Sequence, residues 1–184
     1  MTFLFPKPYA DFVARLRVPA GFLLVAAFAW FSHPDPRSLA WGLPVSALGL
    51  LARAWAAGHL AKNQSLASSG PYAYTRNPLY LGTLLVAAGL ALASRSLGLG
   101  ALFAAVFLCI YLPVIQLEQQ HLRSLFPQYA AYAERVPALL PRMTPAPGEQ
   151  RAFHWALYAR NREYQAAAGF LAGALFLLWK ALNL

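Results

Sequence analysis

A polar run that precedes an apolar segment, residues 70–82, carries the side chains with the clearest chemical potential. Arg76 supplies a guanidinium, whose fork of N–H donors matches carboxylates and phosphates. Asn77 and Pro78 form a typical helix start, because Asn caps free backbone amides through its side chain and Pro loses no hydrogen bond in the first turn. The start of a helix carries partial positive charge. The run therefore predicts a site for an anionic group beside Arg76.

A second polar position, Glu118, lies at the end of a later apolar segment and is followed by Gln119. A carboxylate at that depth is costly unless it has a partner or faces water. The residues alone also allow structural interpretations. Glu118 can be a solvated boundary residue, Arg76 a cation that reaches the headgroup layer, and Tyr72 and Tyr80 part of an aromatic belt.

The composition identifies the elements that must position these side chains. The 184 residues are 59% hydrophobic and only 11% charged, which is too apolar for an ordinary soluble domain. We therefore expect an all-α, polytopic membrane helical bundle that forms a single domain over residues 1–184, with amphipathic helices at the cytoplasmic face. About five transmembrane helices are predicted, over residues 18–31, 39–57, 78–93, 97–117 and 165–182.

The connections and charges predict which ends of these segments meet. The short link 94–96 forces the third and fourth segments into an antiparallel hairpin, which brings Asn77 and Glu118 to the same face. With five spans, most of the 15 lysines and arginines fall on that face. The positive-inside rule then makes this face and the N-terminus cytoplasmic, with the C-terminus on the opposite side. The exceptions are Arg37, Arg95 and Lys180.

Several segments outside the apolar stretches also have a predicted structure. The helix with Glu118 should continue beyond the membrane until Pro127 kinks or divides it. Four prolines over residues 137–147 impose an extended segment, and residues 151–164 fit a helix in the headgroup layer. In the last span, the pair Gly169 and Gly173 is interpreted as a surface for internal helix packing.

Other kinds of site find little support in the sequence. Gly98 and Gly100 follow no strand, so the run around them is interpreted as a flexible helix start and not as a phosphate loop. The histidines have no spacing typical of a metal site, and no metal is expected. They are His33, His59, His121 and His154. No nucleic-acid partner is predicted, and the oligomeric state stays open.

Two parts of the chain resemble a known family. They are Gly70-Pro71-Tyr72 with Arg76-Asn77-Pro78-Leu79-Tyr80-Leu81-Gly82, and Glu118 with Leu122, Phe126, Tyr129, Tyr132, Arg135-Val136-Pro137 and Pro141. This pattern resembles the membrane methyltransferases that include isoprenylcysteine carboxyl methyltransferases and bacterial phospholipid N-methyltransferases. Asn77 stands where that family usually has His, and Gln119 where it usually has a second Glu.

The resemblance implies an S-adenosyl-L-methionine site within residues 70–141 at the cytoplasmic membrane face. It also implies a lipidic or amphiphilic acceptor that arrives from the bilayer and is methylated on a carboxyl oxygen or an amine nitrogen. Arg76 and Glu118 become the candidate catalytic residues. The residues implied to bind the cofactor are Tyr72, Asn77, Pro78, Leu79, Tyr80, Glu118 and Gln119.

Two other functions stay open at this point. A membrane reductase of the sterol or steroid type would use a reduced nicotinamide cofactor from the same face, and a basic loop suits its phosphates equally well. A non-catalytic lipid-binding protein would bind neither cofactor. The discriminating observation is which ligand, if any, stabilises the folded protein.

Overall fold

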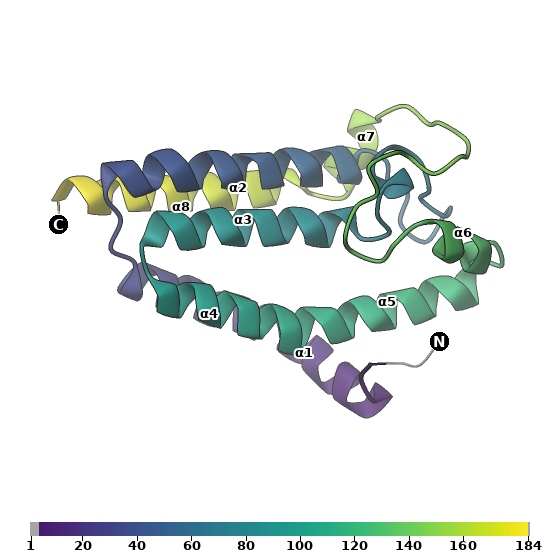
Figure 1. Cartoon of the computed structure of the whole chain (residues 1–184), viewed down its shortest axis with the longest axis horizontal. Helices are drawn as coiled ribbons and strands as arrows, with labels where there is room; N and C mark the ends of the chain where they lie inside the picture. Colours follow the sequence, from purple (N-terminus) through teal and green to yellow (C-terminus); the bar gives the residue numbers. More distant parts are fainter. Residues whose placement is uncertain (1–3, 184) are drawn as a thin grey trace.

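The computed structural model describes residues 4–183, and in this range it contains helices and loops but no strand (Figure 1). The predicted all-α membrane bundle is confirmed. All five predicted apolar segments form helices. The helices are α1 (Lys7–Phe31), α2 (Pro36–Ala57), η1 (Gly70–Ala73), α3 (Pro78–Ser94), α4 (Leu97–Val106), η2 (Phe107–Tyr111), α5 (Leu112–Leu125), α6 (Tyr129–Arg135), α7 (Trp155–Arg160) and α8 (Tyr164–Asn183).

Within residues 4–183, four helical stretches are long and apolar enough to cross a membrane: α1, α2, α8 and the continuous run of 29 residues formed by α4, η2 and α5. The fifth, α3, has 17 residues and is about 25 Å long at 1.5 Å per residue, somewhat short of the ~30 Å hydrocarbon core. The chain passes back and forth along the bundle, and the start of α1 and the end of α8 lie at opposite ends of it (Figure 1). Which end faces the cytoplasm stays a prediction.

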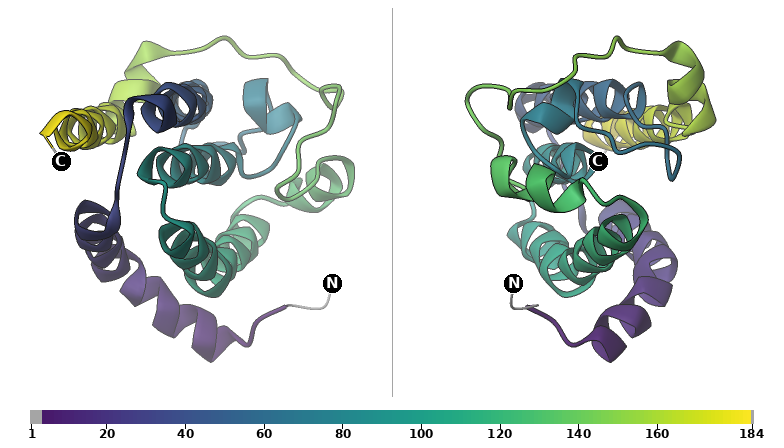
Figure 2. Two further views of the ribbon diagram at one scale, coloured as in Figure 1. Left: turned by 60° about the vertical axis from the view of Figure 1, so that its left-hand side comes forward. Right: turned by 90° about the vertical axis from the view of Figure 1, so that its right-hand side faces the viewer.

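The order of packing places α3 in the middle of the bundle. It contacts α2 on one side and α4 on the other, while α8 packs on α2, and α1 packs on α4, η2 and α5 (Figure 2). The hairpin predicted for α3 and α4 is confirmed. Arg95 adopts a left-handed conformation with φ 53° at the end of α3, and the Ser96 side chain accepts a hydrogen bond from Leu99 N at the start of α4.

Small residues bring α2 and α3 into close contact. A Cβ atom placed on Gly42 would lie 2.4 Å from the carbonyl oxygen of Gly89, so the two backbones approach too closely for a side chain there. The Ser46 hydroxyl donates a hydrogen bond of 2.9 Å to the Val86 carbonyl across the same interface. Close backbone packing of this kind is a principal source of helix association in a membrane.

The packing interpretation of the two glycines in α8 is wrong. A Cβ atom placed on Gly169 or Gly173 would meet no atom within 4 Å. The close glycine contacts lie instead between α2 and α3, where glycines of the two helices face one another. A pair of small residues four positions apart shows that a close approach is possible, and the partner helix decides whether it occurs.

A buried lysine ties α8 to the end of α1. The Lys180 side chain is 9% exposed, and its Nζ donates to the carbonyls of Ala29 at 2.9 Å and Trp30 at 3.3 Å and to the Ser32 hydroxyl at 3.4 Å. A cation at the last turn of a helix also complements the helix dipole.

Lys180→Met is therefore expected to lower the free energy of unfolding by about 1–3 kcal/mol, because the carbonyls at the end of α1 lose their donor. Thermal unfolding in lipid nanodiscs measures this. Arg37→Met is the matched control: Arg37 is an exposed cation at the same end of the bundle. Equal melting temperatures for both variants would contradict the role of Lys180.

Asp35 joins two loops at this end of the bundle. It is the N-cap of α2, where its carboxylate accepts a hydrogen bond of 2.7 Å from Ser38 N, and it forms an ion pair of 2.6 Å with Arg95. The hydrogen bond from the Ser38 backbone and the charge of Arg95 hold the pKa of Asp35 below its usual value, although desolvation opposes them. Both partners are substantially exposed, so the pair adds little stability.

The interfacial helix predicted over residues 151–164 is shorter in the structure. Only α7 is helical, and the chain turns before α8 at Arg162, whose φ is 54°. The Asn161 side chain fixes this turn by donating a hydrogen bond of 2.9 Å to the Ala57 carbonyl at the end of α2. A specific tertiary contact therefore ends the helix that the amphipathic pattern predicts.

The proline-rich segment is extended, as predicted, and runs beside the loop that leads into α3. We call residues 137–146 the strap. The Arg76 backbone N–H donates to the Pro137 carbonyl at 2.9 Å, and the Arg142 N–H donates to the Tyr74 carbonyl at 3.0 Å. The break at Pro127 is also confirmed, since it lies between α5 and α6. The strap thus fixes the backbone that carries the predicted anion site.

Candidate active site

A cavity of about 420 Å³ lies between the start of α3 and the α5–α6 segment, and we call it the polar cavity. Its volume is within the range of small-molecule sites. Its walls come from α1, α2, the loop 60–67, η1, α3, η2, α5 and α6. The residues that line the polar cavity include Arg17, Arg53, Lys62, Tyr72, Arg76, Asn77, Pro78, Leu79, Tyr80, Thr83, Tyr111, Glu118, His121, Leu122, Phe126, Tyr129 and Tyr132.

The structure brings every predicted site residue to this cavity except Gln119. In α5 the lining residues Glu118, His121 and Leu122 are three and four positions apart and share one helix face. Gln119 is one position along and points about 100° away from Glu118. The sequence pairing of Glu118 with Gln119 therefore does not correspond to a shared surface of the site.

The predicted meeting of the two motifs is visible as a direct contact. Tyr80, in the first turn of α3, donates a hydrogen bond of 2.9 Å from its hydroxyl to Oε1 of Glu118 in α5. The two residues are 38 positions apart, and the chain between them forms the hairpin predicted from the short link. Glu118 is exposed and keeps its second oxygen available, so it can accept further hydrogen bonds.

Asn77 starts α3 but does not cap it as predicted. The structure shows no hydrogen bond from a backbone N–H of α3 to the Asn77 side chain. Instead, its Nδ2 donates to the Ala138 carbonyl of the strap at 2.7 Å. Thr75 contacts the same segment through hydrogen bonds of 3.3 Å to Ala138 and 3.1 Å to Leu139. The Asn77 side chain thus anchors the strap, although the residue still lines the polar cavity.

The best evidence for a binding site is a set of polar atoms without partners. Nε and Nη1 of Arg76 and the Tyr129 hydroxyl are the side-chain atoms in residues 4–183 that are buried and lack a hydrogen-bond partner. Both side chains line the polar cavity. Burial raises the pKa of Tyr129, and the nearby Arg76 charge opposes that rise. Buried polar groups are normally satisfied, so these three atoms in one cavity are available to hydrogen-bond a ligand.

Neutral tyrosines brace the wall of the cavity. The Tyr132 hydroxyl donates a hydrogen bond of 2.8 Å to the Tyr72 carbonyl, which joins α6 to η1. Burial raises the pKa of both phenols far above the usual value of about 10, so they stay neutral at physiological pH. These two aromatic side chains are fixed parts of the site and do not supply negative charge.

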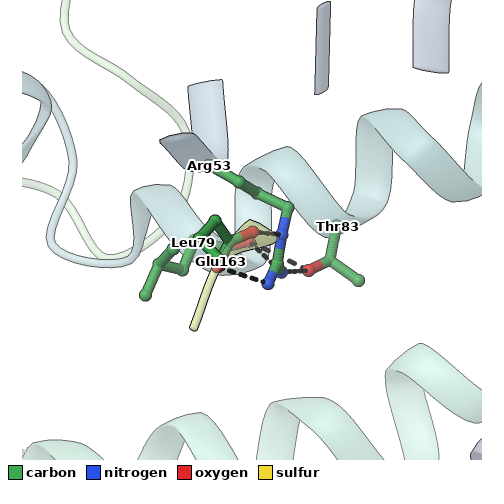
Figure 3. A network of polar contacts seen from close by, with 4 residues as sticks. All are labelled: Arg53, Leu79, Thr83 and Glu163. Carbon is green, nitrogen blue, oxygen red and sulfur yellow. Dashed lines mark hydrogen bonds and ion pairs between the residues drawn. The ribbon is translucent and has the colours of Figure 1, made fainter. Parts of the chain in front are cut away.

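An ion pair that the sequence did not reveal closes another side of the cavity. Arg53 of α2 and Glu163, just before α8, form a two-point ion pair, with 3.0 Å between Nη2 and Oε2 (Figure 3). The same guanidinium donates to the Thr83 hydroxyl and to the Leu79 carbonyl of α3. One side chain therefore ties three helical elements together beside the polar cavity.

Sequence reasoning missed further residues at the site. Arg17 reaches the cavity from α1, and His121 reaches it from α5, three positions after Glu118. The spacing from Glu118 to His121 could have identified the histidine, since residues three apart share a helix face. Arg53 carried a signal too, because an arginine within an apolar span is functional by default. Nothing local in the sequence indicates that Glu163 is its partner.

Comparisons with known proteins identify the family to which the chain belongs. A family model described as phospholipid methyltransferase matches residues 43–129, a range that contains Arg76, Tyr80 and Glu118. The cobalt-zinc-cadmium resistance protein CzcN of Cupriavidus metallidurans is 35% identical over 153 residues, covering 79% of this chain and 71% of that protein. The chain belongs to the phospholipid methyltransferase family. The resemblance predicted from the two motifs is confirmed.

A second relative has a similar name. The nickel-cobalt-cadmium resistance protein NccN of Alcaligenes xylosoxydans xylosoxydans is 31% identical over 151 residues, covering 76% of this chain and 71% of that protein. No solved structure matches the chain significantly. Within residues 4–183, no group of three His, Cys, Asp or Glu side chains is placed to hold a metal ion.

Proposed function

We propose that this chain is an integral membrane methyltransferase that uses S-adenosyl-L-methionine and methylates a lipidic or amphiphilic acceptor at the cytoplasmic membrane face. Membership in the phospholipid methyltransferase family supports the reaction type. The observation that carries the proposal is the set of buried, unpartnered atoms of Arg76 and Tyr129 in the polar cavity, opposite the carboxylate of Glu118.

The residues present suit the chemical groups of this cofactor. Arg76 offers N–H donors for a carboxylate, and an arginine that pairs with a carboxylate is a strong and geometrically specific contact. The free oxygen of Glu118 can accept from an ammonium or from ribose hydroxyls. Arg76 can alternatively orient a carboxylate or phosphate of the acceptor, and the same unpartnered atoms support that role.

When bound, the cofactor supplies an electrophilic methyl group on a sulfonium. S-adenosylhomocysteine would be what remains of the cofactor once the methyl group has moved from sulfur to the acceptor atom. The protein mainly has to align the reacting atoms, which the two helix ends with Arg76 and Glu118 can do. A carboxylate acceptor needs no proton transfer. An ammonium acceptor must first lose a proton, and the imidazole of His121 in the cavity wall is a suitable recipient.

The first test is binding of S-adenosylhomocysteine to the protein in lipid nanodiscs, measured by calorimetry. We expect binding, and we expect Glu118→Ala to weaken it at least about tenfold, since a hydrogen bond to a charged group is worth about 1.5–3 kcal/mol. Gln119→Ala is the matched control, because Gln119 is the next residue and does not line the cavity.

The same samples distinguish the other functions. A reductase would be stabilised by a reduced nicotinamide dinucleotide and not by S-adenosylhomocysteine, whereas a non-catalytic lipid-binding protein would respond to neither. Absence of binding heat for folded parent protein with S-adenosylhomocysteine would refute the proposed cofactor. An equal loss in Glu118→Ala and Gln119→Ala would refute the assigned role of Glu118.

A further inference from the structure

A second cavity, of about 230 Å³, extends between α3 and the α4–η2 segment, and we call it the apolar cavity. Its walls are almost wholly hydrocarbon. The lining residues are Leu24, Thr83, Leu84, Ala87, Ala88, Ala91, Gly100, Phe103, Ala104, Val106, Phe107 and Tyr111. The chemistry proposed for the polar cavity assigns no role to any of these side chains.

The two cavities adjoin at Thr83 and Tyr111, which line both of them, and we call this place the neck. The Tyr111 ring packs edge-on against Tyr80, with 6.1 Å between the ring centroids, and stacks on Phe107, also at 6.1 Å. The Tyr80 hydroxyl in turn contacts Glu118. The neck therefore lies between the polar groups of the candidate active site and the hydrocarbon walls of the apolar cavity.

A local change of helix geometry accompanies two aromatic side chains in the wall of the apolar cavity. The segment η2 (Phe107–Tyr111) is a π-helical turn within the otherwise α-helical run of α4 and α5. Such turns are rare and frequently lie at functional sites. Here both ends of the turn, Phe107 and Tyr111, line the apolar cavity.

Small residues create the space beyond the neck. On α3 the wall is formed by Ala87, Ala88 and Ala91, and on α4 by Gly100. A Cβ atom on Gly100 would lie 3.8 Å from the Ala91 Cβ, which is an ordinary contact, so larger side chains here would fill the cavity. From Thr83 to Ala91 the wall is about 12 Å long, at 1.5 Å rise per residue.

We propose that the apolar cavity holds one hydrocarbon chain of the methyl acceptor, with the chain passing the neck between Thr83 and Tyr111 and its tip near Ala91 and Gly100. This inference rests on the proposed function, because a binding place for the acceptor's chain requires that the acceptor be lipidic. The shared wall with the polar cavity favours the acceptor over a chain of the bulk bilayer, because a chain beside that wall ends next to the candidate active site. A chain held there puts the reactive headgroup at the neck, beside Tyr80 and Glu118.

The test uses palmitic acid with a diazirine at its terminal carbon, at low mole fraction in phosphatidylcholine nanodiscs. After photolysis, peptide mapping measures the label. Saturable labelling of residues 84–91 and 100–107 is expected in the parent protein. Ala91→Phe should reduce it at least about fivefold, because the ring occupies the place of the chain tip. Ala105→Phe is the matched control, since Ala105 is exposed on α4 and lies outside the cavity wall.

Calorimetry with S-adenosylhomocysteine separates the possible failures. If Ala91→Phe and Ala105→Phe bind S-adenosylhomocysteine with unchanged affinity, both variants fold. If Ala91→Phe does not fold, Gly100→Val fills the apolar cavity with a smaller side chain. Non-saturable labelling, equal in all variants, would overturn the chain site and identify the cavity as ordinary bilayer contact. Saturable labelling of a protein that does not bind S-adenosylhomocysteine would instead contradict the proposed function and leave the chain site standing.

Discussion

Glu163→Ala is expected to lower the free energy of unfolding by about 3 kcal/mol, the lower end of the range for breaking a buried ion pair. The loss is large because it leaves the charge of Arg53 largely desolvated without a counterion. The Glu163 side chain is 8% exposed and that of Arg53 is 23% exposed. The pair also fixes the start of α8 against α2 and, through Thr83, against α3.

Two variants make this expectation specific. Glu149→Ala removes a carboxylate from the ion pair with Arg151, in which the side chains are 72% and 52% exposed, so its effect should stay within about 0.5 kcal/mol. Glu163→Gln keeps the shape and removes only the charge. Thermal unfolding in nanodiscs measures all three. If Glu163→Ala has the same melting temperature as Glu149→Ala, the ion pair between Glu163 and Arg53 does not stabilise the fold.

Arg53 and Glu163 also show where prediction from the sequence reaches its limit. The apolar segments, the hairpin and the approach of the two motifs at one face follow from local patterns, since hydrophobic runs and a short link determine them. The pairing of Arg53 with Glu163 spans 110 positions and depends on how α8 docks. Nothing near Glu163 distinguishes it from a solvated residue at the membrane surface.

Asn77 shows a different limit. Its local context favours a helix cap, and Asn77 does lie at the start of α3. The strap offers its side chain a competing acceptor, the Ala138 carbonyl, and that contact is the one formed. A local propensity of about 1 kcal/mol is readily outweighed by a tertiary contact that the sequence does not display. The position of Asn77 was therefore predictable, whereas its hydrogen bond was not.

The second large effect concerns Arg76, for which function and stability should change in opposite directions. Arg76→Met is expected to reduce methyl transfer at least about 100-fold, the typical loss when one preorganised charge-stabilising donor is removed. In the ligand-free protein the same substitution should raise the free energy of unfolding by about 1–2 kcal/mol. The reason is that Nε and Nη1 are buried without partners, and an unsatisfied buried polar group costs about 1–3 kcal/mol.

Opposite signs are what separate a ligand-binding arginine from a structural one. Replacement of an arginine that holds the fold together would lower the melting temperature of the protein. The same direction is predicted above for Glu163→Ala, which breaks the ion pair with Arg53. Lys62→Met serves as the control for stability, because Lys62 is an exposed cation in the wall of the same cavity and its loss should leave the melting temperature unchanged. Tyr129→Phe removes the other unpartnered atom and should stabilise the ligand-free protein in the same way. If Arg76→Met instead destabilises the protein and leaves methyl transfer intact, Arg76 is part of the scaffold and the anion site lies elsewhere in the cavity.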